Sequence, residues 1–307
     1  MRIAAIDLGS NSVILLIAIR DRAGHIVPLY QESQITRIGY RVTETGRIQE
    51  SSAAATLGVL EHYFDIAQKN GADHLMITAT SAMRDAANSA DFLDQVEKAI
   101  GIRPRIISGE TEAHYVMKAV RHDFPELGGP VLIFDIGGGS TELIRYRGNS
   151  IESLRSINIG AVRLTEQFVR HDPMSDTEHR SARHAIWEIL PDLNFSAQIS
   201  AVGVGGTITT LQAVNKKVPK YQSNVIHKSI LQRSEISDVF RLFRALSLAE
   251  RKKLAGLPPK RADIIPMGAL IALTILEKYD IPQLYVSDRG LRWGMVYEKF
   301  AQPTDAG

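Results

Sequence analysis

The sequence of 307 residues contains no cysteine. Disulfides, thiolate metal sites and cysteine nucleophiles are therefore excluded, and a reducing compartment is consistent with this composition. Long hydrophobic runs are also missing, because the longest apolar stretches, 13–19 and 267–276, are well short of the ~20 residues that a membrane-spanning helix needs. The first residues do not show the pattern of a signal peptide. We therefore expect a cytoplasmic protein without a membrane partner.

An excess of charge of one sign is missing too, because 36 Lys and Arg are balanced by 34 Asp and Glu. The formal net charge of +2 argues against a protein that coats nucleic acid, and we expect no nucleic-acid partner. Two common nucleotide-binding motifs are also missing, the Gly-Lys-Ser/Thr of a P-loop and the G-x-G-x-x-G of dinucleotide-binding proteins. Any phosphate site must be of another type.

What the sequence contains instead is an alternation of strand and helix patterns, which is typical of an α/β protein. Three apolar segments open the chain, and we expect them to form an antiparallel meander. A helix pattern follows, which Ser51 or Ser52 would cap and Asn70-Gly71 would end. Strand and helix patterns then alternate as in strand–helix–strand units. The expected strands of this half are 2–8, 13–19, 25–36, 74–79 and 102–108, and the later helices are 91–100 and 110–121.

The segment 121–130 combines charge with Pro and Gly and is the best candidate for a domain boundary. After it the meander pattern starts again, with strands expected at 131–135, 142–147 and 151–159 and a turn at Gly148-Asn149. We expect one lobe over 1–123 and a second over 124–289. A C-terminal helix within 290–307 is expected to return to the first lobe.

Two stretches repeat one device: "IAAIDLGSNSVILLI" and "LIFDIGGGSTELIRY" each contain an apolar strand that ends in Asp, a turn of small residues and a returning strand. Their aspartates, Asp7 and Asp135, lie 128 residues apart. Internal repetition at this distance predicts two similar lobes, each of which contributes a turn to a shared cleft.

Such turns suit phosphate, because successive backbone N–H groups point at one spot and Ser or Thr hydroxyls add donors. An aspartate at the strand end would repel phosphate unless a divalent cation lay between them, so Asp7 and Asp135 imply Mg²⁺ or another divalent cation. Either turn alone is more typical of a plain hairpin, and the repetition favours phosphate binding. A third turn, "VGVGGTITTL", places Gly205, Gly206 and Thr207 before a helix whose N-terminus can face an anion, although a close packing contact explains it equally well.

Six motifs in order resemble those of the exopolyphosphatase/guanosine pentaphosphate phosphohydrolase family: "DLGSNS", "ATSAMRDAAN", "ISGETEA", "DIGGGSTEL", "VGVGGTITTL" and "SDRGLRWG". The resemblance extends from residue 3 to about residue 296. It implies the fold superfamily of actin, sugar kinases and heat-shock ATPases, that is, an α/β protein with two ribonuclease-H-like lobes and an active-site cleft between them.

The resemblance also implies roles for individual residues. Glu112 is similar to the family's catalytic base, which orients a water for attack on a terminal phosphate, and Arg84 is similar to an arginine close to that base. Asp135 and Glu142 resemble acids near the metal and the attacking water, so the implied metal ligands are Asp7, Asp135 and Glu142. The implied phosphate-binding residues are Ser10, Asn11, Gly137, Gly138, Gly139, Ser140, Thr141, Gly205, Gly206 and Thr207.

Several alternatives stay open at this stage. In one alternative, Glu112 is an acid in the first turn of a helix capped near Ser108, where it only interacts favourably with the helix dipole and has no catalytic role. The lysine-rich stretches around 215–220 and 250–261 are either solvated charges or a track for a polyanion. Ile14, Thr111 and Trp293 depart from the residues common in the family, which puts the substrate in question.

The resulting hypothesis is a Mg²⁺-dependent exopolyphosphatase that releases orthophosphate from the end of inorganic polyphosphate. The alternatives are hydrolysis of guanosine pentaphosphate, which would connect the protein with the stringent response, and a nucleotide- or polyphosphate-binding regulator that does not hydrolyse. A sugar-kinase-type phosphotransferase fits the motifs less well. The chain resembles the short, two-domain form of the family, in which homodimers are common.

Overall fold

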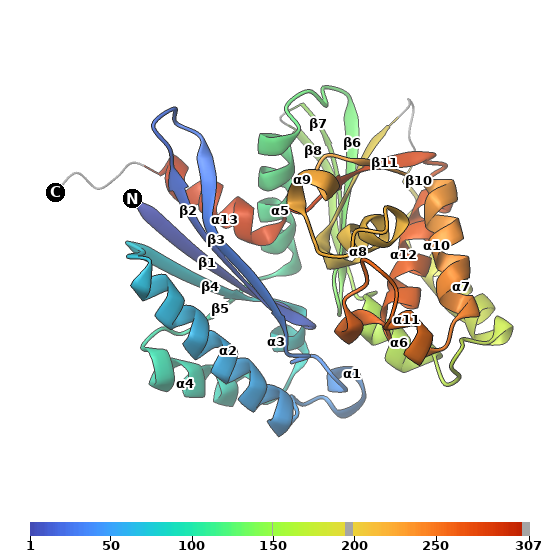
Figure 1. The fold of residues 1–307 in the computed structure, drawn as a ribbon, viewed down its shortest axis with the longest axis horizontal. Helices are drawn as coiled ribbons and strands as arrows, with labels where there is room; N and C mark the ends of the chain where they lie inside the picture. The colour runs from blue at the N-terminus through green and yellow to red at the C-terminus, as the bar shows by residue number, and fades with distance from the viewer. Residues whose placement is uncertain (149, 194–198, 303–307) are drawn as a thin grey trace. The chain divides into compact units, whose positions relative to one another are not determined.

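The computed structural model describes residues 1–148, 150–193 and 199–302. They divide into two compact units, Val120–Gly290 and Met1–Ala119 together with the C-terminal segment that begins at Leu291. Each unit contains one mixed β-sheet and its own hydrophobic core (Figure 1). The division falls within helix α5 (Gly109–Asp123), close to the predicted boundary between 123 and 124.

The sheet of the first unit has the strand order β3-β2-β1-β4-β5. β1 pairs antiparallel with β2 and parallel with β4, as in a meander followed by a crossover helix. The strands are β1 (Arg2–Leu8), β2 (Ser12–Arg20), β3 (Ile26–Ile35), β4 (His74–Ala79) and β5 (Arg105–Ile106). The helices are α1 (Val42–Thr45), α2 (Glu50–Lys69), α3 (Ser81–Asp85), α4 (Ser89–Ile100), the first part of α5, and α13 (Leu291–Ala301).

Strands β1 and β2 are apolar on both sides because helices pack on both faces of this sheet. Ala4, Ile6 and Leu8 share a core cluster with residues of α2 and α4. Helix α13 also packs on β1 and β2, and the Thr78 hydroxyl lies 3.3 Å from the Met295 sulfur. Because side chains alternate along a strand, the odd-numbered β1 positions, including Asp7, lie on the face opposite α2.

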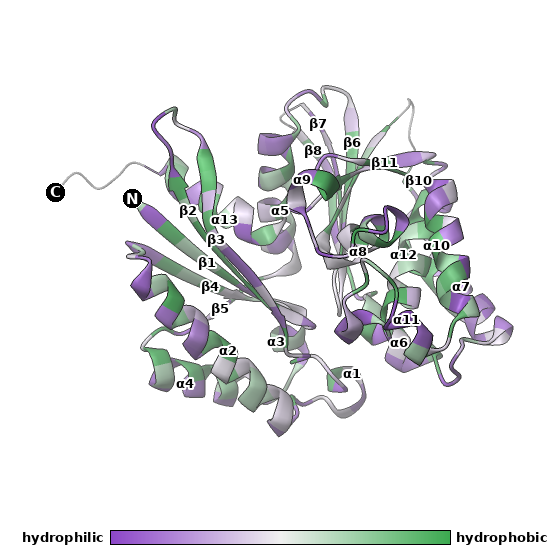
Figure 2. Ribbon diagram, viewed as in Figure 1, coloured by the Kyte–Doolittle hydropathy of each residue, from purple (hydrophilic) through white to green (hydrophobic). Residues whose placement is uncertain are grey.

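The sheet of the second unit has the order β10-β11-β9-β6-β7-β8. Helix α12 is buried along nearly its whole length. Helix α10 buries only one face, and Figure 2 accordingly shows hydrophobic (green) and hydrophilic (purple) residues alternating along α10. The strands are β6 (Pro130–Ile136), β7 (Thr141–Arg147), β8 (Ser150–Ile157), β9 (Ser200–Val204), β10 (Ile230–Gln232) and β11 (Gln283–Ser287). The helices are α6 (Ala161–Phe168), α7 (Asp176–Ile189), α8 (Gly205–Asn215), α9 (Ser223–Ile226), α10 (Arg233–Ala245), α11 (Leu248–Arg251), the 3₁₀ turn η1 (Pro259–Arg261) and α12 (Ile265–Lys278).

The two sheets repeat one topology. The order β3-β2-β1-β4-β5 of the first unit corresponds to β8-β7-β6-β9-β11 of the second, with β10 added at the edge. The pairings of the corresponding strands agree as well. They are antiparallel within each meander and parallel from the central strand to β5 and β11, and the added β10 pairs antiparallel. The repeat predicted from the two Asp-containing stretches is therefore confirmed.

Two local predictions were wrong. Ser51 and Ser52 do not cap α2, which begins one residue earlier, after Gln49. The reason is that the Asn88 side chain bonds both the N–H and the carbonyl of Ile48, at 2.8 and 3.1 Å, and so fixes the entry into the helix upstream of the serines. The expected strand 102–108 is only two residues long in β5.

Two further expectations reach beyond the described residues. The turn at Gly148-Asn149 includes residue 149, and the expected C-terminal helix includes residues 303–307. Within the described ranges, no helix is long and apolar enough to cross a membrane.

A glycine after the third strand of each meander presses against the turn that follows the Asp-containing strand. A Cβ at Gly39 would lie 2.8 Å from the Ser10 Cβ. A Cβ at Gly160 would lie 2.3 Å from the carbonyl oxygen of Gly138. Because real Cβ atoms essentially never approach another heavy atom to within 3.0 Å, both contacts require glycine.

We predict that Gly160→Ala lowers the free energy of unfolding by about 1–3 kcal/mol, because the overpacked backbone contact must open. The matched control is Gly58→Ala in α2, where a Cβ meets nothing within 4 Å. This control should be neutral or stabilise by up to ~1 kcal/mol, because Ala favours a helix over Gly. Urea unfolding measures both, and wild-type stability of the Gly160 variant would contradict the predicted contact.

Candidate active-site residues

The turn between β1 and β2 is held through its carbonyl oxygens. The Gly39 N–H donates to the Ser10 carbonyl at 2.8 Å. The N–H groups of Thr36 and Arg37 donate to the Asn11 carbonyl at 3.2 and 3.0 Å. In a trans peptide the N–H points away from the C=O, so the Asn11 amide N–H faces away from the 36–39 segment.

The side chains of this turn have different tasks. The Ser10 Oγ accepts a hydrogen bond of 3.1 Å from the Ala82 N–H, which positions the first turn of α3 and leaves the hydroxyl proton available as a donor. Asn11 is 7% exposed, and its Oδ1 has no hydrogen-bond partner among the described residues. A buried polar atom of this kind is costly unless a ligand or water bonds it.

Arg84 and Glu112, predicted as neighbours, form an ion pair in the first unit. The Arg84 Nη1 lies 3.0 Å from the Glu112 Oε2 and also donates to the Ile107 carbonyl at 2.8 Å. Ser108 caps α5 by accepting the Thr111 N–H at 3.1 Å, and Glu112 lies in the same first turn. At this position the Glu112 carboxylate interacts favourably with the helix dipole, as the structural interpretation predicts. The same position is compatible with the catalytic interpretation.

The Glu112 side chain is only 13% exposed. Burial raises the pKa of Glu112 above its ordinary value, while the charge of Arg84 and its hydrogen bond oppose this rise. A carboxylate with a raised pKa is a stronger base than an exposed one, which suits proton abstraction from water. Arg84 fixes the direction in which this carboxylate points.

The glycine turn of the second unit is held in the same way as the first. The Gly137 carbonyl accepts the Ala161 N–H at 2.9 Å. The Gly138 carbonyl accepts the N–H groups of Val162 and Arg163 at 2.9 and 3.1 Å. The Arg163 side chain donates its Nε–H to the Gly139 carbonyl at 2.8 Å.

These three carbonyls all face α6. The N–H groups of the same peptides, which belong to Gly138, Gly139 and Ser140, therefore point to the other side of the turn. Three successive amides directed to one side form a site suited to an anion. The Gly137 N–H does not belong to this set, because it closes the turn on the Ser140 carbonyl at 3.0 Å.

The hydroxyl protons of two predicted phosphate ligands are used inside the protein. Thr141 is fully buried and donates to the Ile159 carbonyl at 2.6 Å. Thr207 donates to the Ile136 carbonyl at 3.1 Å. Both hydroxyls therefore hold the turns in place, and at Thr141 and Thr207 they are not available as donors to a phosphate.

The second unit pairs two acids where the first has one. Asp135 lies directly opposite Glu142 in the β6–β7 register, on the same face of the sheet. At the corresponding position of the first unit, Asp7 lies opposite Ile14. Glu142 is 1% exposed and accepts a hydrogen bond of 2.8 Å from the Ser156 hydroxyl.

The sequence interpretation missed Arg261. Its Nη1 would lie 1.9 Å from a Cβ at Gly206, so the guanidinium covers the N-terminus of α8. Burial lowers the pKa of Arg261 to about 10, and the side chain stays charged at neutral pH. The lysine-rich stretch that contains it was noted in the sequence, but nothing in the pattern separated this arginine from the exposed lysines.

Arg251, from the same stretch, has a structural role. It is 5% exposed and donates to the carbonyls of Phe243, Leu246 and Ala262, and to the Asp172 carboxylate at 2.7 Å. The bond to Ala262 fixes the backbone next to Arg261.

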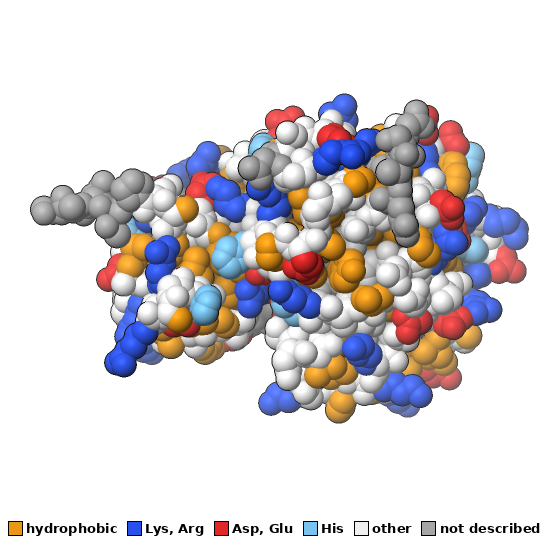
Figure 3. Space-filling view, turned by 90° about the horizontal axis from the view of Figure 1, so that it is seen from above, with side chains coloured by type: hydrophobic (Ala, Val, Ile, Leu, Met, Phe, Trp, Pro, Cys, Tyr) orange, Lys and Arg blue, Asp and Glu red, His pale blue; other side chains and the backbone are white. Residues whose placement is uncertain are grey.

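The basic residues do not form a continuous track on the face drawn in Figure 3, where Lys and Arg are interspersed with Asp and Glu.

The donor chemistry of Asp135 and Glu142 fits a hard divalent cation, because two facing carboxylates supply oxygen ligands. The Asp135 Oδ1 reaches to within 2.3 Å of where a Gly205 Cβ would be, so the third turn approaches this acid as well. No group of three or more His, Asp or Glu side chains suited to a metal occurs in the described ranges. The two acids are thus a partial ligand set that substrate oxygens and waters would complete.

The model of the Ppx/GppA phosphatase family matches residues 17–302. The chain belongs to this family. Exopolyphosphatase 2 of Mycobacterium tuberculosis is 31% identical over 310 residues, which cover 96% of this chain and 97% of that protein. The bifunctional 3-dehydroquinate synthase/phosphatase of Fusobacterium nucleatum is 33% identical, and this chain spans 46% of its length.

Solved structures of family members have the same fold. The Aquifex aeolicus PPX-GPPA enzyme matches with 35% identity and a TM-score of 0.82, covering 97% of this chain and 99% of that one. An exopolyphosphatase from Cytophaga hutchinsonii matches with 26% identity and a TM-score of 0.91, covering 97% of each chain. These findings confirm the predicted family, the two-lobe actin-like fold and the class of phosphoanhydride hydrolases.

If Glu112 is the base, as its resemblance to the family motif implies, it must be deprotonated to act. We therefore predict that phosphatase activity falls at low pH with an apparent pKa above 4.5, the ordinary value of a glutamate. Arg84→Gln removes the cation that lowers the pKa of Glu112, so this pKa should rise further. The acid limb of the pH–activity profile should then move to higher pH. The control Arg103→Gln removes an exposed arginine that pairs with Asp94 and Glu97. Measurements of kcat/KM against pH test this, and an acid limb that stays in place in the Arg84 variant would contradict it.

Proposed function

We propose that this member of the Ppx/GppA family is an exopolyphosphatase, which hydrolyses the terminal phosphoanhydride bond of inorganic polyphosphate and releases orthophosphate. The observation that carries the proposal is the Arg84–Glu112 pair, a buried carboxylate whose pKa is raised and whose orientation is fixed by an arginine. The exopolyphosphatase names of relatives that match over nearly their full length support the choice of substrate.

In the proposed reaction, Glu112 accepts a proton from a water whose oxygen forms the new bond to the terminal phosphorus. The bond from that phosphorus to the bridging oxygen breaks, and the shortened chain leaves with the electron pair. Little covalent chemistry is needed, so positioning of the water and stabilisation of the phosphoryl oxygens supply most of the rate enhancement. No nucleophile from the protein takes part.

The phosphoryl oxygens would be bound by backbone amides and arginine. The amides of Gly138, Gly139 and Ser140 all point away from α6, which leaves them available to an anion. Arg261 would add positive charge at the N-terminus of α8, beside Gly206. Arg84 is held by Ile107 and Glu112, so we assign it mainly to the positioning of the base.

Asp135 and Glu142 would hold a Mg²⁺ ion, with Asp7 of the first unit as the third acid implied by the family motifs. When bound, the cation would neutralise charge on the phosphoryl oxygens. The repulsion between two facing carboxylates is the physical reason to expect a cation at this position.

Guanosine pentaphosphate is the alternative substrate, and its hydrolysis would connect the protein to the stringent response. Ile14, opposite Asp7, offers no charge or hydrogen bond where the family often has a basic or polar residue. This difference favours the simpler inorganic chain. A cytoplasmic location and a homodimer remain predictions from the sequence.

We predict that Glu112→Ala lowers kcat for orthophosphate release by about 10²–10⁴-fold, the usual contribution of a general base. The matched control is Glu110→Ala, an exposed acid one position before Thr111 in the same helical turn. Release from long-chain polyphosphate and from guanosine pentaphosphate would be measured in parallel. Release from neither substrate by the wild type would favour a non-catalytic regulator, and equal losses in both variants would argue against Glu112 as the base.

We predict that removal of divalent cations with EDTA abolishes release and that Mg²⁺ restores it. Asp135→Asn should raise the Mg²⁺ concentration for half-maximal activity by about 10–100-fold, because one anionic ligand is lost. Glu126→Gln, an exposed acid of the same unit, is the control. Activity that survives EDTA treatment would contradict the metal proposal.

A further inference from the structure

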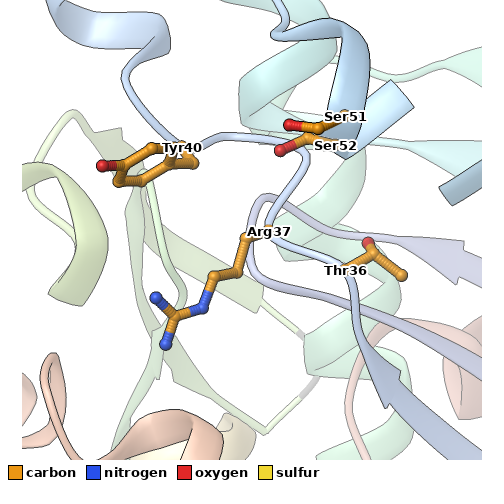
Figure 4. A pocket seen from close by; sticks show the side chains of 5 residues that line it. All are labelled: Thr36, Arg37, Tyr40, Ser51 and Ser52. Carbon is orange, nitrogen blue, oxygen red and sulfur yellow. The ribbon is translucent and has the colours of Figure 1, made fainter. Parts of the chain in front are cut away.

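A cavity of about 260 Å³ lies in the first unit, between the segment after β3 and the start of α2. Figure 4 shows its five lining residues, Thr36, Arg37, Tyr40, Ser51 and Ser52, arranged around an open space. All of these side chains can donate hydrogen bonds, one is a cation and none is an acid. This lining is suited to an anion rich in oxygen atoms.

The lining of this cavity includes a buried hydroxyl, that of Thr36. Thr36 is 9% exposed, and its Oγ1 has no hydrogen-bond partner in the part of the chain that the structure describes. The neighbouring Asn11 Oδ1 is in the same condition. Buried polar atoms are nearly always hydrogen-bonded in folded proteins, so an unpaired hydroxyl in a cavity wall indicates a ligand or water that the cavity takes up.

The opposite wall is the N-terminus of a long helix. The first N–H groups of a helix have no intrahelical partner. Among the described residues, the side chain of Gln49, the N-cap residue of α2, makes no capping bond to them and donates instead to Thr45 and Arg47. Ser51 and Ser52 lie in this first turn, and Figure 4 shows their hydroxyls beside the cavity. The partial positive charge of a helix N-terminus favours an anion at this point.

The cavity is connected to the first turn through the backbone. The amides of Thr36 and Arg37, two of the lining residues, donate to the Asn11 carbonyl. Arg37 has φ +57°, an uncommon conformation for a residue other than glycine, and the bond to Asn11 holds it there. An anion in the cavity would therefore lie next to the turn that carries Ser10 and Asn11.

We propose that this cavity is a subsite for a phosphoryl group of the substrate other than the one that is cleaved. The subsite rests on the proposed function for the identity of its ligand, a chain of phosphoryl groups. Arg37 supplies the charge, Thr36, Ser51 and Ser52 supply hydroxyls, and the N-terminus of α2 supplies amides. The same chemistry would accept the phosphates of a guanosine nucleotide, and the test separates these two sources.

The test measures binding of inorganic tripolyphosphate and of guanosine pentaphosphate by isothermal titration calorimetry. The variants are Arg37→Gln and Thr36→Val. The controls are Arg22→Gln, an exposed arginine in the β2–β3 turn, and Thr43→Val, an exposed threonine of α1. We expect Arg37→Gln to weaken tripolyphosphate binding by about 10-fold or more, because a charge-assisted hydrogen bond is lost, and the controls to bind as the wild type does.

Thr36→Val separates a ligand role from a structural one. If the hydroxyl serves only the ligand, the variant should bind about 3–10-fold more weakly, while its melting temperature without ligand stays equal or rises, since an unpaired buried hydroxyl has been removed. A lower melting temperature with unchanged binding would overturn the proposal. Steady-state kinetics should show a higher KM for polyphosphate with little change in kcat, because a subsite binds ground state and transition state alike.

The outcomes distinguish the two proposals. Wild-type hydrolysis of polyphosphate together with wild-type binding by both variants would reject the subsite and leave the proposed function in place. Weaker binding by the variants with no hydrolysis by any protein would support the subsite and reject the proposed function. Weaker binding of guanosine pentaphosphate alone would identify the nucleotide as the source of the phosphoryl group and overturn the inorganic chain.

Discussion

Both units depend on one backbone constraint, the hydrogen bonding of the carbonyl oxygens in the turn after each Asp-containing strand. In the first unit the 36–39 segment donates to these carbonyls, and in the second the start of α6 does so. Because the N–H of each trans peptide points away from its carbonyl, this arrangement leaves the amides on the opposite side. Gly39 and Gly160 make it possible, since a side chain at either position would push the donor segment off the turn.

The two units share these hydrogen-bonded turns and differ in the ionisable side chains next to them. The register pairs Asp135 with Glu142 in one and Asp7 with Ile14 in the other, so only the second unit presents two acids at this position. The Arg84–Glu112 pair belongs to the first unit alone. The two units thus share the turns and differ in a few side chains, which place the proposed base in the first unit and a facing pair of acids in the second.

Arginine shows how strongly the surroundings decide a residue's role. Arg251 and Arg261 are ten positions apart in one basic stretch. Arg251 is buried against three carbonyls and an aspartate, where it holds the chain, whereas Arg261 lies over Gly206 at a helix N-terminus. The lysines between and around them are exposed, so a count of charges in the sequence could not have separated these three roles.

The sequence by itself determined the repeated meander, the α/β class and the family, because these follow from apolar periodicity, from glycine and aspartate at fixed positions, and from motifs that are continuous in the chain. It also placed Glu112 after Ser108 in the first turn of a helix, since a capping signal is local. The predicted serine cap of α2 failed because Asn88, remote in the sequence, fixes Ile48. Only the tertiary structure decided that Thr141 and Thr207 donate their hydroxyl protons to backbone carbonyls and that Arg261 covers Gly206. It also decided that the Thr36 hydroxyl, in a cavity wall, has no hydrogen-bond partner within the described part of the chain. Each of these features depends on which residues, distant in the sequence, come into contact in the folded protein. The hydrogen-bond partners and the burial of a side chain follow from those contacts and not from its residue type alone.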